Sequence, residues 1–239
     1  MYNSYMKKLL LIIFYGLLTL FIALVAFLSF SYIVISPKID GLYTKVLMEN
    51  KTNNNTYTPL SKISLNIQKA AIASQDESFY QNPGIDLKGT IRAVFYTIIS
   101  GKRQGASTIT EQLAKNVYFN DKDNLQTDLE TKLYAVFLNL KYPKNRILEM
   151  YLNEIYFGKN AYGIAQASAT YFRTTADKLS LPQSAFLIGL IEAPSYLSDN
   201  SSASKKQAIL VLESMEKEKF ISQYEEKKAE ETILNGKNY

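Results

Sequence analysis

The sequence predicts an all-α protein in which one N-terminal membrane-spanning helix precedes a single helical domain. Two observations carry this prediction. No charged residue occurs between Leu9 and Pro37, a stretch longer than the roughly 20 residues that cross a bilayer as a helix. Beyond residue 58, apolar residues recur at helical spacing in one segment after another, without a convincing β-strand pattern. The 239 residues therefore provide one anchor and one domain of ordinary size.

The apolar segment is interpreted as a retained anchor of a single-pass cell-membrane protein. Lys7 and Lys8 precede it, which predicts a cytoplasmic N-terminus and an extracellular domain. The alternative is a cleaved signal peptide, but the apolar run is too long for an ordinary signal core, and no clean small-x-small cleavage site ends it. The predicted division is residues 1–8 as the cytoplasmic N-terminus, 9–36 as the transmembrane anchor, 37–57 as a stalk and 58–239 as the domain.

The domain is predicted to be a succession of helices. Ser61 is expected to cap the first of them, which would bury Ile67 and Ala70. Pro143 is expected to begin another helix, and Ser180-Leu181-Pro182-Gln183 has the form of a capping box with proline in the first turn. Further helices are expected over residues 90–99, 108–117, 129–140 and 185–191, and residues 205–234 are expected to form one charged amphipathic helix or a pair.

Composition excludes several kinds of chemistry. The chain has no cysteine and no histidine, so disulfides, thiolate nucleophiles, Ser-His triads and the usual zinc ligands are absent. Acid–base chemistry must come from carboxylates, lysine or tyrosine. The net charge of +5 suits a domain near anionic lipid or a pyrophosphate, although mixed surface charge is the simpler explanation. No basic stripe with interleaved aromatic residues predicts nucleic-acid binding.

Two motifs give the sequence a family resemblance. The first is Ala73-Ser74-Gln75-Asp76-Glu77-Ser78-Phe79, and the second is Gly105-Ala106-Ser107-Thr108-Ile109-Thr110-Glu111-Gln112. Together they resemble the first two motifs of the family-51 glycosyltransferases, membrane enzymes that polymerise lipid II into the glycan strands of peptidoglycan. The resemblance covers roughly residues 58–235. It implies a lysozyme-like, all-α transglycosylase domain.

In the first motif, the resemblance places the general base of the family at Gln75. An amide cannot hold a proton at neutral pH, so this residue cannot act as a base. Asp76, Phe79 and Gly84 match the family pattern, and Asn82 replaces a histidine that helps to hold the loop. Glycine at position 84 is expected to supply a turn. Asparagine at position 82 is a mild replacement, because its side chain forms local hydrogen bonds and its backbone accepts tight turns.

The second motif is better preserved, with Glu111 in place of the usual glutamine. The simpler, structural interpretation of this motif is a helix cap formed by serine and threonine. The functional interpretation is a phosphate site, because free N–H groups and the positive end of a helix dipole attract anions. Cationic side chains would then hold the lipid pyrophosphate. The substrate-binding residues implied by the resemblance are Arg103, Ser107, Thr108, Gln112, Lys115 and Asn116.

The third motif of the family is lost. Counting back without gaps from the well-matched fourth motif, Arg146 to Asn153, places the family Arg-Lys pair on Thr127 and Asp128. The second family glutamate, which assists at the pyrophosphate end, falls on Thr131. Two cations and an anion beside the phosphate are therefore replaced.

These motifs predict a membrane-anchored protein of cell-wall assembly with weak or lost catalysis and retained binding of lipid II and glycan strands. Its other expected partners are membrane lipid and proteins of cell-wall synthesis. The resemblance allows a divalent cation, Mg or Mn, near the diphosphate, but no metal ligand is assigned. An active glycosyltransferase with a displaced carboxylate, Asp76, Glu77 or Glu111, is the first alternative. A lytic lysozyme-like enzyme with Glu77 as its acid is the second.

Overall fold

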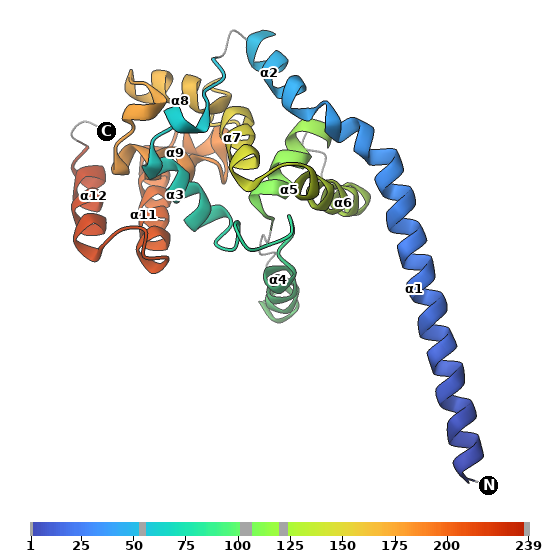
Figure 1. Ribbon diagram of the computed structural model, residues 1–239. Helices are drawn as coiled ribbons and strands as arrows, with labels where there is room; N and C mark the ends of the chain where they lie inside the picture. The colour runs from blue at the N-terminus through green and yellow to red at the C-terminus, as the bar shows by residue number, and fades with distance from the viewer. Residues whose placement is uncertain (1, 53–55, 101–106, 120–123, 237–239) are drawn as a thin grey trace. The chain divides into compact units, whose positions relative to one another are not determined.

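The computed structural model describes residues 2–52, 56–100, 107–119 and 124–236. Contacts between residues divide the chain into two units, Met1–Gly41 and Leu42–Tyr239 (Figure 1). The first unit is one long helix, α1 (Tyr2–Asp40). The second unit contains all the other elements of the described chain.

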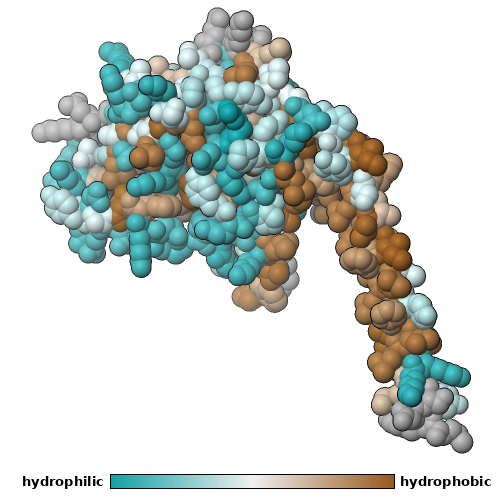
Figure 2. Space-filling model, viewed as in Figure 1, coloured by the Kyte–Doolittle hydropathy of each residue, from teal (hydrophilic) through white to brown (hydrophobic). Residues whose placement is uncertain are grey.

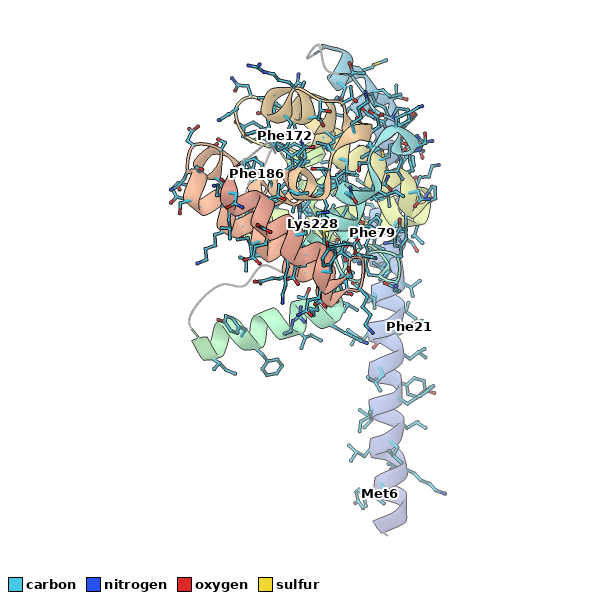
Figure 3. All side chains as sticks on the ribbon, turned by 90° about the vertical axis from the view of Figure 1, so that its left-hand side faces the viewer. Met6, Phe21, Phe79, Phe172, Phe186 and Lys228 are labelled. Atoms are coloured by element: carbon cyan, nitrogen blue, oxygen red, sulfur yellow. The ribbon has the colours of Figure 1, made fainter. Side chains whose placement is uncertain are left out.

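Helix α1 is apolar and exposes its large side chains. Its most apolar 18-residue window has a mean hydropathy of 2.8, and none of that window is buried. Figure 2 shows hydrophobic surface along most of the helix, and Phe21 projects away from it in Figure 3. By length and composition, this helix can cross a membrane.

The second unit is built from helices and short helical turns. Among the described residues the backbone forms no β-strand, and its β-type pairing is an isolated antiparallel bridge between Tyr156 and Tyr162. The all-α class is therefore confirmed. In chain order, the elements are α2 (Leu42–Thr52), η1 (Leu60–Lys62), α3 (Leu65–Gln75), α4 (Leu87–Ser100), α5 (Ile109–Ala114), η2 (Lys115–Phe119), α6 (Leu125–Lys141), α7 (Lys144–Glu154), α8 (Gly163–Phe172), η3 (Ala176–Lys178), α9 (Leu181–Leu190), α10 (Pro194–Leu197), α11 (Ser201–Lys217) and α12 (Gln223–Asn235).

Helices α3, α9 and α11 form one half of the core. Helix α9 is apolar around most of its circumference and buries Leu187 and Ile188 completely, as expected of a helix surrounded by others. A Cβ atom on Gly189 would lie 3.0 Å from the backbone nitrogen of Ala208 on α11. The absence of a side chain at this glycine lets α9 and α11 approach closely. On the far side of α9, the Phe186 ring meets Phe172 of α8 at 5.8 Å (Figure 3).

Helices α5, α6 and α7 form the other half, and α7 also anchors the entry to the domain. Asn153 Nδ2 donates to Thr58 O at 2.8 Å, and Thr58 N donates to Asn153 Oδ1 at 2.7 Å. Glu149 accepts hydrogen bonds from the Tyr57 hydroxyl at 2.7 Å and from Leu60 N at 2.8 Å. The polar residues of the fourth motif thus satisfy backbone groups of the incoming chain, which is a structural role.

Helix α4 differs from its neighbours because its apolar face is uncovered. It stands apart from the other helices of the unit in Figure 1, and a hydrophobic patch marks it in Figure 2. Five of its large apolar side chains are exposed, namely Leu87, Ile91, Phe95, Tyr96 and Ile99. An apolar face of this size on a protein surface indicates contact with a partner or a membrane.

The expected helices are present, although several of them begin or end at other residues than predicted. Ser64, rather than Ser61, caps α3 by accepting from Asn66 N, because residues 60–62 form a 3₁₀ turn. The helix expected over 108–117 changes after Ala114 to a π-helical turn that reaches Phe119. The C-terminal segment is a pair of helices, one of the two expected arrangements, since the chain turns after Lys217 and a Ser222 capping box begins α12.

Candidate active site

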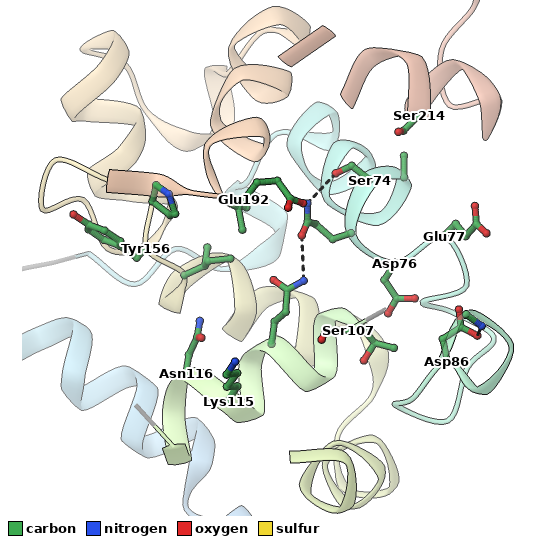
Figure 4. A pocket seen from close by; sticks show the side chains of 18 of the residues that line it. Ser74, Asp76, Glu77, Asp86, Ser107, Lys115, Asn116, Tyr156, Glu192 and Ser214 are labelled. Atoms are coloured by element: carbon green, nitrogen blue, oxygen red, sulfur yellow. Dashed lines mark hydrogen bonds between the residues drawn. The ribbon is translucent and has the colours of Figure 1, made fainter. Parts of the chain in front are cut away.

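The side chain of Gln75, the last residue of α3, belongs to a chain of hydrogen bonds. Gln112 Nε2 of α5 donates to Gln75 Oε1 at 3.1 Å, and Gln75 Nε2 donates to Ser74 Oγ at 3.4 Å, as the dashed lines in Figure 4 show. Behind Gln112, the Tyr151 hydroxyl of α7 donates to Gln112 Oε1 at 3.0 Å. The chain links three helices through the residue that occupies the base position of the first motif.

A backbone carbonyl decides the direction of this chain. Ser74 Oγ donates its proton to Ala70 O at 2.9 Å, so the serine oxygen must accept from Gln75 Nε2. Gln75 Oε1 then faces Gln112 Nε2, and Gln112 Oε1 accepts from Tyr151. Burial raises the pKa of Tyr151, so this hydroxyl keeps its proton and acts as the donor. The Gln75 amide is therefore held in one orientation. One hydrogen of its NH₂ group takes no part in this series of hydrogen bonds.

Asp76 ties the first motif to the start of α5. Its Oδ1 accepts from Asn82 Nδ2 at 2.8 Å, and its Oδ2 accepts from Ile109 N at 3.2 Å. The side chain is 6% exposed, and burial raises its pKa. Both oxygens are thus occupied by donors that hold the loop closed.

Asn82 and Gly84 hold the same loop from the other side. Asn82 Oδ1 accepts from Gly84 N at 2.9 Å and from Lys144 Nζ at 3.0 Å. Gly84 has a φ of +102°, and a Cβ atom there would lie 2.4 Å from Ala135 O. Only glycine fits this backbone and this space. The hydrogen bonds of Asn82 therefore hold this loop, the role expected at position 82.

The second motif places Thr108 in a structural role and Ser107 at the surface of the cleft. Thr108 Oγ1 donates to Gly84 O at 2.7 Å and accepts from Glu111 N at 3.0 Å, which caps α5. This hydroxyl is therefore fully used inside the protein. Ser107 is exposed and lines the cleft. Arg103 lies outside the described residues.

A polar cleft of about 840 Å³ lies between α3, α5 and α11 (Figure 4). It brings together most of the residues that the sequence singled out. Two other residues that the sequence singled out, Glu111 and Thr131, do not line it. The predicted site residues that line it are Gln75, Asp76, Glu77, Ser107, Thr108, Gln112, Lys115 and Asn116.

Glu77 is paired with cations at the edge of the cleft. Its Oε2 accepts from Lys217 Nζ of α11 at 2.9 Å, and its Oε1 lies 4.0 Å from Arg92 Nη1 of α4. The hydrogen bond from Lys217 lowers the pKa of Glu77. This carboxylate is therefore kept ionised.

Glu111 points away from the cleft, into the contact between α5 and α6. Its side chain forms an ion pair with Lys132 Nζ at 2.8 Å and is 4% exposed. Burial raises the pKa of Glu111. Its Oε1 atom and the buried Thr131 Oγ1 have no hydrogen-bond partner among the described residues. Thr131 thus lies in a buried polar region, without the carboxylate that the resemblance places at position 131.

Asp128 has a local reason to be where the family carries a cation. It lies in the first turn of α6, whose N-cap is Asn124. A carboxylate is favoured there by the helix dipole. A carboxylate at Asp128 therefore suits the start of α6.

Glu192 also lines the cleft, and the sequence did not single it out. It follows α9 and is exposed. In Figure 4 its side chain extends toward the hydrogen bond between Gln75 and Ser74. It is close enough to Tyr151 to raise the pKa of that hydroxyl electrostatically, in addition to the larger effect of burial. Its position just before Ala193-Pro194-Ser195, a segment that resembles the family, is the sequence signal that would have pointed to it.

The described residues offer no protein-only site for the divalent cation that the resemblance allows. They contain no group of three or more Asp, Glu, His or Cys side chains placed to hold a metal ion. Asp76 and Glu77, two of the carboxylates in the cleft, are already bonded to protein donors.

Comparisons with known proteins agree with the geometry. Penicillin-binding protein 1A of Rickettsia typhi is 32% identical over 179 residues, which cover 72% of this chain and 23% of the relative. Penicillin-binding protein 2a of Streptococcus pneumoniae is 37% identical over 183 residues, or 76% of this chain and 25% of the relative. Penicillin-binding protein 1F of Bacillus subtilis is 36% identical over 209 residues, or 82% and 29%. The chain spans about a quarter of the length of these relatives.

The family model described as transglycosylase matches residues 42–216. The match covers both motifs, the cleft and helices α2 to α10, as well as almost all of α11. Asp76, Gly84 and Thr108, which hold the loop and cap α5, all lie within the matched residues. This chain belongs to the transglycosylase family, glycosyltransferase family 51.

Proposed function

We propose that this protein is anchored in the cell membrane, binds lipid II and nascent glycan strands in its cleft, and polymerises them slowly or not at all. The observation that carries the proposal is the oriented amide of Gln75 at the base position. Glycan transfer from lipid II needs a base for the attacking sugar hydroxyl and stabilisation of the charge on the departing diphosphate. The first need is unmet at position 75.

The expected loss of rate is large. A missing general base costs about a hundredfold to ten-thousandfold, or roughly 3–5 kcal/mol of transition-state stabilisation. The carboxylate that the resemblance places at position 131 is also absent, because this residue is a threonine, which is uncharged and buried here. Both changes act on the chemical step rather than on substrate binding.

The candidate substitutes named by the sequence are engaged elsewhere. Asp76 holds the loop through both oxygens, and Glu77 is paired with Lys217. Glu111 is buried against Lys132 and does not line the cleft. A lytic reaction through Glu77 is disfavoured as well, because a general acid needs a raised pKa, whereas Lys217 lowers the pKa of this residue.

The lining of the cleft supports continued binding of a diphosphate sugar. Lys115, Arg92 and Lys217 line it together with hydroxyl and amide side chains. Cationic side chains recognise diphosphates. Proteins of cell-wall synthesis are natural further partners for such a binding protein.

The apolar surfaces support a location at the membrane. Helix α1 supplies the anchor, and Lys7 and Lys8 at its start favour a cytoplasmic N-terminus with the domain outside. The uncovered face of α4 suits contact with acyl chains. A lipid-linked substrate would then meet the domain at the bilayer surface.

The direct test uses the detergent-solubilised full chain with labelled lipid II. Binding is expected without glycan strands at ordinary enzyme rates. An Arg103→Ala, Lys115→Ala double variant should weaken binding at least tenfold, since each lost phosphate contact removes a charge-assisted bond of about 1–2 kcal/mol.

The matched control removes two exposed lysines away from the cleft, Lys178→Ala and Lys228→Ala. It should bind as the wild type does. Equal affinity of all three proteins would refute the phosphate site. Rapid polymerisation by the wild type would refute the loss of catalysis.

A further inference from the structure

Four carboxylates line the cleft, and three of them have structural bonds. Asp76 and Glu77 are engaged as described above, and Asp86 Oδ1 accepts from Gly89 N at 2.9 Å at the start of α4. Glu192 is the one for which the described part of the chain supplies no hydrogen bond or ion pair. It is thus the carboxylate in this cleft whose acceptor capacity is left for a ligand.

Its placement gives that capacity a use. Glu192 extends toward the bond between Gln75 and Ser74 in Figure 4, and it acts electrostatically on Tyr151, the first donor of the chain that orients Gln75. A sugar hydroxyl that binds beside Gln75 would meet an N–H donor from the amide on one side. The exposed carboxylate would lie on the other side.

We propose that Glu192 is the proton acceptor for the slow glycan transfer that this cleft retains, an inference that rests on the proposed function. The Glu192 carboxylate takes the proton of the attacking sugar hydroxyl as that oxygen bonds to the anomeric carbon. The bond from the anomeric carbon to the diphosphate oxygen breaks, and the diphosphate leaves with the electron pair. The proton passes from exposed Glu192 to solvent. Gln75 orients the hydroxyl and exchanges no proton.

The test compares single-turnover transfer of labelled lipid II by the full chain in detergent. Glu192→Gln should lower the slow rate about a hundredfold, the usual effect of losing a general base, while lipid II affinity stays within twofold. Glu192→Asp should restore part of the rate. The control Glu231→Gln changes an exposed glutamate of α12 outside the cleft and should leave the rate unchanged.

A second background separates base catalysis from a general defect. In a Gln75→Glu protein, which has its own carboxylate at the base position, Glu192→Gln should lower the rate less than twofold. An equal loss in both backgrounds would overturn the proposal, because Glu192 would then support folding or binding.

Three other outcomes are decisive. If the Glu192→Gln variant transferred glycan as fast as the wild type, the proposal about Glu192 would be overturned and the proposed binding function would stand. If the wild type formed no product under conditions in which the Gln75→Glu protein does, the proposal about Glu192 would likewise be overturned and the binding function would stand. Loss of lipid II binding by the wild type would instead refute the proposed function itself, which is a separate result.

Discussion

Gln75 differs from glutamate by an NH₂ group in place of one oxygen, and an amide cannot accept the proton that a carboxylate could. The surroundings accept either residue. Gln112 Nε2, which now donates to the amide oxygen, would donate equally well to a carboxylate. Ser74 would only need to turn its hydroxyl from Ala70 O toward the new oxygen. The scaffold around position 75 therefore still fits a base.

Gln75→Glu should raise the rate of lipid II polymerisation about a hundredfold over the wild type, because it returns a proton acceptor to the attacking hydroxyl. Thermal unfolding should change little, since the bond from Gln112 persists. Glycan strands resolved on a gel measure the rate. The exposed Gln81 provides a control with the same change of charge, Gln81→Glu. A rate that rises equally in both variants would show a charge effect rather than a restored base.

Helices α5 and α6 are joined by the ion pair between Glu111 and Lys132, which stands where the family has a glutamine on α5. Glu111 is almost wholly buried, whereas the Lys132 side chain is 34% exposed. Attraction to the partly hydrated lysine does not outweigh the loss of solvation of the carboxylate, so the pKa of Glu111 is raised. The pair holds two helices together at a cost that depends on pH.

This pKa shift predicts the sign of a pH effect on stability. A carboxyl group with a raised pKa in the folded state holds its proton more tightly there than in the unfolded chain. Its favourable contribution is present below the unfolded pKa and is lost as the pH rises through the folded value. The free energy of unfolding of the wild type, minus that of Glu111→Gln, should therefore fall as the pH rises from about 4, the region of a free glutamate.

Urea denaturation at a series of pH values measures this difference. Glu231→Gln, which alters an exposed glutamate of α12, should run parallel to the wild type. If the Glu111→Gln curve also ran parallel, the carboxylate would not be destabilised by burial.

At the scale of the whole molecule, the exposed apolar surfaces support the proposed location at a membrane. Helix α1 exposes apolar side chains along most of its length, and α4 exposes a second apolar face. Exposed apolar surface of this extent indicates contact with a partner or a membrane. A membrane would suit each of the two helices, and it would also hold the lipid-linked substrate proposed for the cleft.

Removal of residues 9–36 should move the protein from the membrane fraction to the soluble or peripheral fraction of cells. The full chain should resist extraction by alkaline carbonate, as expected of a spanning helix of this hydropathy. Immunoblots of the fractions measure the distribution. A full chain released by carbonate would contradict the anchor. Retention of the shortened chain by peripheral contact would point to α4.

Local patterns in the sequence were enough to predict the all-α class, the apolar first helix, the capping box at Ser180 and the family. Each depends on neighbours within a few turns of helix, or on a motif that is contiguous. The amide at Gln75 was likewise visible by position. Local patterns misplaced the cap at Ser61, since a 3₁₀ turn cannot be told from the first turn of a helix by spacing alone.

Only the tertiary structure decided what surrounds these residues, because those contacts join segments far apart in the chain. Tyr151 and Gln112 meet Gln75 from two other helices, Glu111 turns toward Lys132, and Glu192 arrives at the cleft from beyond α9. Helix packing sets these meetings, and no spacing in the sequence encodes them. The sequence thus determined that an amide stands where the resemblance places the base, and the packing of the helices determined which carboxylates line the same cleft and which of them have partners among the described residues.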